Sequence, residues 1–273
     1  GMLREEGMLP PGDLRNCIAA LAEAEPLMMN LFQHRFQGLG PLKGHSLGNL
    51  IVAAMCEMTG NFEDAVRETS RVLAIRGRVL PSTLEDVTLG AELEDGTIVT
   101  GQSRVNKALK IRHAFLQPEA PHALPGVIEA IEDADVIIIG PGSLFTSIIP
   151  NLLVPEIAQA IRNNTRAPKI YVCNVMTQVG ETAGFSAADH VRAIMRHIGK
   201  GVITHALVNN GRVDNEVLER YRKTGAEYVE PDEDAIEMMG VRALHGNFLD
   251  VTNLVRHHPQ KLASTIFRVV ARL

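Results

Sequence analysis

The chain has 273 residues, a formal net charge of −5 and a pI near 6.1. This balance lacks the basic footprint of a nucleic-acid-binding protein, and no apolar run has the length of a membrane span. Since no signal-peptide pattern is present either, the sequence predicts a cytoplasmic protein without a nucleic-acid or membrane partner. The three cysteines have no C-x-x-C spacing, so we expect buried thiols at Cys17, Cys56 and Cys173.

Residues 12–76 are predicted to form a helical region. Asp13 follows a Pro-Pro-Gly stop and is a good N-cap, although a cap is all that its position requires. The apolar face of this first helix is expected to include Cys17, Ile18 and Leu21. A second helix is expected from Leu27 to about Phe36.

Two further helices are predicted to begin after Ser46 and Asn61, whose side chains are good N-caps. His45 and Asn49 flank the first of these caps, and their side chains could point at a shared site. A structural role is the more common one for a lone histidine beside a cap. Both interpretations stay open from the sequence.

Residues 77–118 change to an alternating pattern, which predicts a small β-rich insertion. The expected strands are Arg78–Leu80, Val87–Leu93, Thr97–Thr100 and Lys110–Leu116. Asp95-Gly96 lies between the second and the third, and this dipeptide is typical of a β-hairpin.

Residues 126–273 alternate between apolar strands and amphipathic helices. This alternation implies right-handed crossovers and a doubly wound, mostly parallel, Rossmann-like sheet, so we treat residues 1–273 as a single α/β domain. The expected elements include strands at Val136–Ile139, Ile170–Val175, Ile203–Val208 and Tyr228–Val229, and helices at Leu152–Asn163 and Pro259–Leu273. The first of these strands is β-branched throughout, which favours burial on both faces of the sheet.

A glycine-rich turn follows this first strand directly. In open α/β sheets, ligands bind where the chain leaves the carboxyl end of a strand, and the next helix offers N–H groups to an anion. The turn matches no standard phosphate motif, and a tight turn that needs small residues is an equally good interpretation of its spacing. The candidate ligand-binding residues here are Gly140, Gly142, Ser143, Leu144, Phe145 and Thr146.

Neutral polar residues follow the next two strands, with Asn174 and Thr177 after one and Asn209 after the other. The carboxyl ends of parallel strands share one edge of a sheet, so these side chains should lie near the turn. The sequence has no metal-binding cluster and no nucleophile elbow, and it assigns no catalytic residue. This inventory suits hydrogen-bonded recognition of a phosphorylated, polyhydroxyl ligand.

Several segments together carry a resemblance to a known family. They are LPPGDLRNCIAALAE, GHSLGNL, RGRVLPSTLEDVTL, GPGSLFTSIIPNLLVP and NVMTQVGET. The chain resembles the YvcK, or gluconeogenesis-factor, branch of the YvcK/CofD-like family. The resemblance implies a Rossmann-like α/β sandwich and a cytoplasmic regulator of carbon metabolism and cell shape that responds to UDP-N-acetylglucosamine. We also expect a homo-oligomer, with a dimer as the first candidate.

The CofD branch implies a different function, the transfer of a phospholactyl group from a guanylyl donor with the help of magnesium. The run GPGSLFTSIIPN is similar to the YvcK form, whereas the transferases tend to carry a PSNP-type turn. A nucleotide-sugar-binding regulator without a required cofactor is therefore favoured. A magnesium-dependent transferase is the alternative, and a purely structural protein is the third possibility.

The chain departs from the family pattern at its start. Family members begin with a strand, a GGGTG turn and a DDGGSSG loop, and we expect the first βα unit to be missing here. The resemblance further implies that Asp13 and Asn16 face this gap. It also implies that Tyr221 and Arg256 contact the nucleotide sugar, although the residues alone would give a packed tyrosine and a solvated arginine.

Overall fold

The computed structural model describes residues 12–23, 26–251 and 255–271. Its contacts divide the chain into two compact units. The first unit comprises Gly1–Asp86 and Ala123–Val127, and the second comprises Val87–His122 and Ile128–Leu273. The boundaries of a single domain over residues 1–273 stay a prediction.

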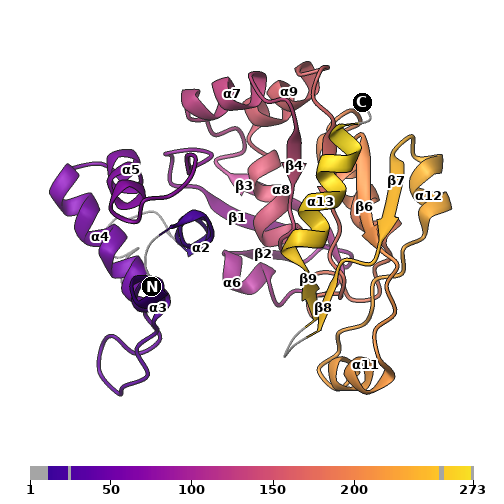
Figure 1. Cartoon of the computed structure of the whole chain (residues 1–273), viewed down its shortest axis with the longest axis horizontal. Coiled ribbons are helices and arrows are strands. Elements are labelled where there is room, and N and C mark those ends of the chain that lie inside the picture. Colours follow the sequence, from indigo (N-terminus) through magenta and orange to yellow (C-terminus); the bar gives the residue numbers. More distant parts are fainter. Residues whose placement is uncertain (1–11, 24–25, 252–254, 272–273) are drawn as a thin grey trace. The chain divides into compact units, whose positions relative to one another are not determined.

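The first unit is helical, as predicted, and its helices are α2 (Gly12–Leu21), α3 (Pro26–Gln33), α4 (Leu47–Thr59) and α5 (Phe62–Val72) (Figure 1). Ser46 and Asn61 cap α4 and α5, and each side chain accepts a hydrogen bond from the backbone three residues later. This confirms both predicted caps, which follow from local chemistry alone. The core of the unit is built from Ile18, Ala19, Phe32, Val66 and Leu73.

Some predictions for this unit are wrong in detail. Asp13 lies inside α2 rather than before it, and Cys17 is exposed on that helix while Arg15 is buried. The expected strand at Arg78–Leu80 does not form, because Gly77 adopts a positive φ of 88° and Pro81 follows at once. A positive φ turns the chain away from the extended conformation that a strand needs.

The β-rich insertion forms a three-stranded antiparallel sheet in the order β2-β1-β3. Its strands are β1 (Thr88–Leu93), β2 (Ile98–Thr100) and β3 (Ile111–Gln117), with the short helix α6 (Gln102–Val105) between the last two. The predicted hairpin is present: Gly96 has a φ of 83°, and the Thr97 N–H donates to Asp95 Oδ1 at 2.9 Å. The insertion is therefore confirmed.

The rest of the second unit is built on a parallel sheet in the order β4-β5-β6-β7. Its strands are β4 (Ile137–Ile139), β5 (Lys169–Val172), β6 (His205–Asn209) and β7 (Arg242–Gly246). Its helices are α7 (Pro125–Glu132), η1 (Leu144–Ile148), α8 (Ile149–Leu152), α9 (Pro155–Asn163), α10 (Ala187–Ile198), α11 (Asn215–Arg222), α12 (Glu233–Met238) and α13 (Pro259–Val270). A hairpin of β8 (Leu249–Val251) and β9 (Val255–His257) precedes α13. This confirms the predicted α/β class.

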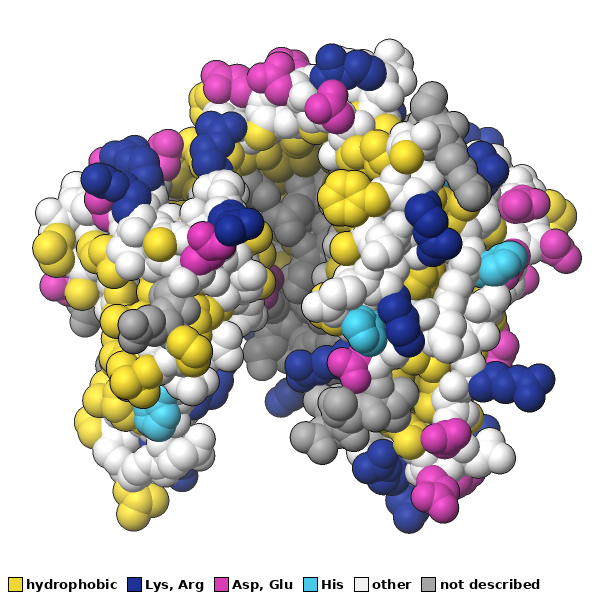
Figure 2. Space-filling model, in the orientation of Figure 1, with side chains coloured by type: hydrophobic (Ala, Val, Ile, Leu, Met, Phe, Trp, Pro, Cys, Tyr) yellow, Lys and Arg dark blue, Asp and Glu magenta, His cyan; other side chains and the backbone are white. Residues whose placement is uncertain are grey.

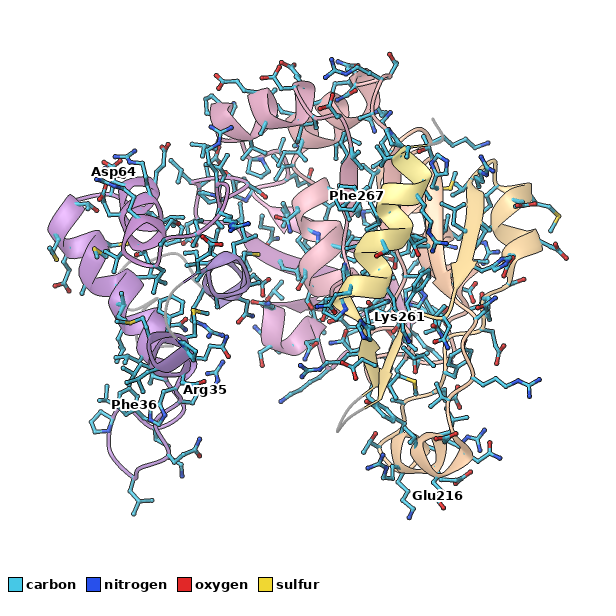
Figure 3. The ribbon with its side chains drawn as sticks, in the orientation of Figure 1. Arg35, Phe36, Asp64, Glu216, Lys261 and Phe267 are labelled. Atoms are coloured by element: carbon cyan, nitrogen blue, oxygen red, sulfur yellow. The ribbon has the colours of Figure 1, made fainter. Side chains whose placement is uncertain are left out.

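Helix α13 covers part of the parallel sheet (Figure 1). Its residues Leu262, Ile266 and Val269 pack against a cluster that contains Ile170 and Leu207. Phe267 projects from the same helix (Figure 3) and is 73% exposed, and basic side chains lie near this helix on the same face of the molecule (Figure 2).

The structure corrects three expectations for the sheet region. Ile138 in β4 is 48% exposed while Ile137 and Ile139 are buried, so the strand is buried on one face and not on both. The expected helix at Leu152–Asn163 is broken, since Pro155 begins a separate helix. Tyr228 forms a single bridge to Met176 instead of a strand.

Long apolar helices are rare in the described residues. No single helix there has the length and apolar composition needed to cross a membrane, and one pair, Leu144–Leu152 with Pro155–Asn163, meets the criteria only together, across a 73° bend.

His197 joins α10 to the antiparallel sheet. Its Nε2 accepts a hydrogen bond from the Ala114 N–H at 2.8 Å, and its Nδ1 lies 2.6 Å from the Ala193 carbonyl oxygen. The ring also stacks on His113, with 4.7 Å between ring centroids. Burial lowers the pKa of His197 to about 4, so the ring is neutral and its Nε2 can accept.

We predict that this histidine makes the fold acid-sensitive. Below the ordinary histidine pKa of 6.5 the unfolded chain binds a proton at this position, while the folded protein does not until about pH 4. The free energy of unfolding should therefore fall as the pH drops through this window, by up to about 3 kcal/mol. Urea denaturation at pH 7 and pH 4 should show that the free energy of unfolding falls less between these pH values in His197→Gln than in the wild type. The exposed His34→Gln variant is the control, and a His197→Gln loss equal to that of the wild type would refute the assignment.

Candidate functional site

The glycine-rich turn lies at the carboxyl end of β4, where the sequence places it. Gly140 has a φ of +86°, which only glycine adopts without strain, and it is exposed, while Gly142 and Ser143 are half-buried. Asn174, at the end of the neighbouring strand β5, donates from Nδ2 to the Gly142 carbonyl oxygen at 2.9 Å. Within the described part of the chain, the N–H groups of Gly142 and Ser143 have no hydrogen-bond acceptor. They are available to a ligand.

The segment after the turn is a single π-helical turn, in which the Ile148 N–H donates to the Ser143 carbonyl oxygen at 2.9 Å. Isolated π-turns of this kind are often found at functional sites. Leu144, Phe145 and Thr146 are all buried here. The sequence suggests helical spacing but does not predict the π-turn.

A buried carboxylate holds this segment in place. Glu181 is 1% exposed, and it accepts hydrogen bonds from the Phe145 N–H at 2.9 Å and from the Thr146 hydroxyl at 2.6 Å. Burial raises the pKa of Glu181, and these hydrogen bonds oppose that shift. The carboxylate thus takes the place of an anion at this helix start, so the donors of Phe145 and Thr146 are already used.

Glu181 is the functional residue that sequence reasoning missed. It lies in the polar loop after β5, and the sequence gives no sign that the loop folds back onto residues 145–146. A lone acidic residue in a loop is normally solvated, so only the structure assigns it this role.

The other edge residues are mainly bound within the protein. Asn209 donates from Nδ2 to the Gly211 carbonyl and to Tyr228 Oη, and its Oδ1 accepts from the Phe248 N–H. Thr177 exchanges two hydrogen bonds with the backbone of Glu227. Both residues therefore brace the carboxyl edge, and ligand contact by either one stays a prediction.

Tyr221 lies beside β9, the strand that contains Arg256. Tyr221 Oη accepts a hydrogen bond from the Val255 N–H at 2.8 Å, and His257 Nε2 lies 3.0 Å from the Cys173 carbonyl oxygen. These contacts bring α11 and β9 to the same edge as Asn174. Arg256 points to the opposite side of β9 from its two neighbours, because side chains alternate along a strand. It is exposed, opposite Asp250.

The four candidates from the helical unit lie in two places, with Asp13 and Asn16 in α2 and His45 and Asn49 at the start of α4. Asn16 Oδ1 accepts a hydrogen bond from Arg15 Nη2 at 2.5 Å, and Asp13 lies three residues earlier in the same helix, α2. His45 and Asn49 lie on either side of the Ser46 cap, and the Asn49 N–H donates to that hydroxyl at 3.3 Å. These four residues belong to the first unit and the turn belongs to the second, and the two units are described separately. That both sets of residues bind one ligand therefore stays a prediction.

Metal ligands are not gathered anywhere in the described residues. No group of three or more histidine, cysteine, aspartate or glutamate side chains lies there that could hold a metal ion.

Comparison with known proteins identifies close relatives. A family model described as 2-phospho-L-lactate transferase CofD matches residues 1–249. A gluconeogenesis factor of Halalkalibacterium halodurans is 48% identical over 97% of this chain and 83% of its own length. The gluconeogenesis factor of Bacillus subtilis is 46% identical over 97% of this chain and 84% of its own. A Nostoc relative with the same term in its name is 50% identical, and the match spans 98% of this chain but 60% of that protein.

A solved structure agrees with these sequence matches. The crystal structure of a UPF0052-family protein from Bacillus halodurans has a TM-score of 0.93 and 48% sequence identity to this chain. The match covers 98% of this chain and 86% of that one. The fold described above is therefore that of the relatives.

We predict that Glu181 fixes the turn segment. Glu181→Ala leaves the Phe145 N–H and the Thr146 hydroxyl buried without an acceptor, which typically costs about 1–3 kcal/mol for each group. Hydrogen exchange of the Phe145 amide, followed by NMR, should become at least tenfold faster, about 1.4 kcal/mol. Glu181→Gln keeps one acceptor oxygen, so its Phe145 amide should exchange at a rate between those of the wild type and Glu181→Ala. Glu237→Ala, at an exposed position of α12, is the control, and an unchanged Phe145 amide in Glu181→Ala would contradict the assignment.

Proposed function

Because this chain belongs to the CofD family and matches gluconeogenesis factors over nearly its whole length, we propose that it is a nucleotide-sugar-binding regulator of carbon metabolism. The ligand proposed is UDP-N-acetylglucosamine. The proposal extends to a cytoplasmic homodimer that acts in cell-shape and cell-wall homeostasis. Its first support is the name that the relatives carry.

The observation that carries the ligand proposal is the turn at residues 140–143. The N–H groups of Gly142 and Ser143, which have no acceptor in the described part of the chain, can donate to a diphosphate, as backbone groups at helix starts do. Asn174 and Glu181 hold the turn from two sides, so the donors are oriented before a ligand arrives. The rim is neutral, and this suits the hydroxyl and amide groups of a sugar.

The transferase alternative is favoured by the printed description of the matching family model. That reaction needs magnesium, and carboxylates are the usual ligands of this ion. The described residues offer no such cluster, so they do not fit a metal site and we derive no metal-dependent step.

We expect UDP-N-acetylglucosamine to raise the melting temperature of the protein more than GDP does. Ligand at a hundredfold excess over its dissociation constant adds about 2.7 kcal/mol to the free energy of unfolding. Thermal shift with each nucleotide, with and without magnesium, measures the difference. Gly142→Val is the matched variant: the nearest atom to a Cβ there is 3.6 Å away, so the fold tolerates the residue while its methyl groups crowd the turn. A larger shift with GDP, magnesium and the deazaflavin precursor would favour the transferase instead.

Arg256 gives a second test, of the contact with the nucleotide sugar that the family resemblance implies. A guanidinium can bind a diphosphate through two parallel N–H···O bonds, which an ammonium cannot reproduce. We expect Arg256→Ala to weaken UDP-N-acetylglucosamine binding at least tenfold, about 1.4 kcal/mol, and Arg256→Lys to restore it only in part. Isothermal titration measures both, and the melting temperature without ligand should barely change.

The control for Arg256 is Asp250→Asn, which changes the charge directly opposite in the hairpin. It should not weaken binding. Equal affinities of the wild type and Arg256→Ala would make Arg256 a solvated surface residue.

A further inference from the structure

The helical unit contains a buried arginine for which the described residues supply no counter-ion. Arg15 in α2 is 6% exposed. Among the described residues its guanidinium makes one hydrogen bond, from Nη2 to the neutral Asn16 side chain, and its Nε has no partner. A buried charge is costly unless it is paired, so a counter-ion is expected at this position.

Arg35 brings a second positive charge to the start of α4, because its backbone pairs with Ser46, the N-cap of that helix. Burial lowers the pKa of the Arg15 guanidinium, and the positive charge of Arg35 lowers it further. Arg35 itself donates from Nη1 to the Gly44 carbonyl oxygen at 2.8 Å and carries no ion pair among the described residues. Arginine stays protonated in proteins, so two cations lie close together here.

Gly48 positions this guanidinium at the start of α4. A Cβ at residue 48 would lie 2.9 Å from Arg15 Cδ and 2.6 Å from the Phe32 carbonyl oxygen, so only glycine fits beside the arginine stem. Gly48 is in the first turn of the 13-residue helix α4, where the helix dipole favours an anion. Among the described residues, the Leu47 N–H donates to the His34 carbonyl oxygen and the Asn49 N–H donates to Ser46, so the Gly48 N–H is the donor left at this helix start. The positive charge of Arg15 and the positive end of the α4 dipole therefore lie side by side, and both favour an anion.

A second polar group of this turn is also unsatisfied. Asn49 Oδ1 is buried and has no hydrogen-bond partner among the described residues. This atom accepts hydrogen bonds, so it calls for a donor such as a hydroxyl group. A ligand with both an anionic group and a hydroxyl group would satisfy Arg15 and Asn49 together.

We propose that the start of α4, with Arg15 and Arg35, binds the phosphoryl group of a hydroxyl-bearing organic phosphate. The phosphate oxygens accept from Arg15 Nε, and a ligand hydroxyl donates to Asn49 Oδ1. The inference stands without the nucleotide-sugar proposal, because it rests on residues of the helical unit and is tested with smaller probes.

The test compares Arg15→Met with the wild type in phosphate-free buffer and in the presence of inorganic phosphate or ribose 5-phosphate. Methionine fills similar space without charge. If the guanidinium lacks a counter-ion, the variant should melt at the same or a higher temperature than the wild type without phosphate. Both probes should raise the melting temperature of the wild type, and binding by Arg15→Met should be at least tenfold weaker. NMR of the Arg15 Nε–H signal, identified by its loss in the variant, should shift upon titration.

Arg71→Met is the matched control in the same unit, because Arg71 is exposed and already pairs with Glu68 at 2.9 Å. It should respond to both probes like the wild type. The proposal would be overturned if Arg15→Met melts at a lower temperature than the wild type without phosphate and the wild type responds to neither probe. Arg15 would then be the partner of a carboxylate in the protein itself. Equal affinities for inorganic phosphate and ribose 5-phosphate would contradict the proposed hydrogen bond from a ligand hydroxyl to Asn49 Oδ1. Failure of UDP-N-acetylglucosamine to bind would leave this test unaffected.

Discussion

The candidate site depends on one buried carboxylate. Glu181 accepts hydrogen bonds from the Phe145 N–H and the Thr146 hydroxyl, and it thereby fixes the π-turn that follows β4. Asn174 holds the other side of the same segment through the Gly142 carbonyl. With both ends fixed, the short stretch at residues 140–143 can keep its N–H groups directed outward. The protein supplies its own anion to one part of the helix start, and the preceding turn is the part at which we propose that the ligand binds.

Much of the fold could be predicted from the sequence, because its signals are local. The caps at Ser46 and Asn61 depend on residues three positions apart, and the Asp95-Gly96 hairpin depends on a dipeptide. Apolar strands alternating with helices implied a parallel sheet, and its carboxyl edge follows from that topology. The exposed Ile138 escaped prediction, since burial of a strand depends on its neighbours in the sheet and not on its own residues.

The site was predictable only in outline, for the same reason. Its location at the glycine-rich turn came from the strand that precedes it, but the contacts that hold the turn join residues more than 30 positions apart. The sequence assigns no contact to Glu181 or to Arg15, and both are buried by parts of the chain that periodicity cannot bring together. Asn209 shows the reverse case: its type and place suggest a ligand contact, while its hydrogen bonds are used inside the fold.

The most direct test of this account is a crystal structure of the protein with UDP-N-acetylglucosamine bound. The account predicts that diphosphate oxygens accept hydrogen bonds from the N–H groups of Gly142 and Ser143, while Glu181 keeps its bonds to Phe145 and Thr146. A ligand bound without contact to residues 140–143, or a Glu181 side chain released on binding, would contradict it.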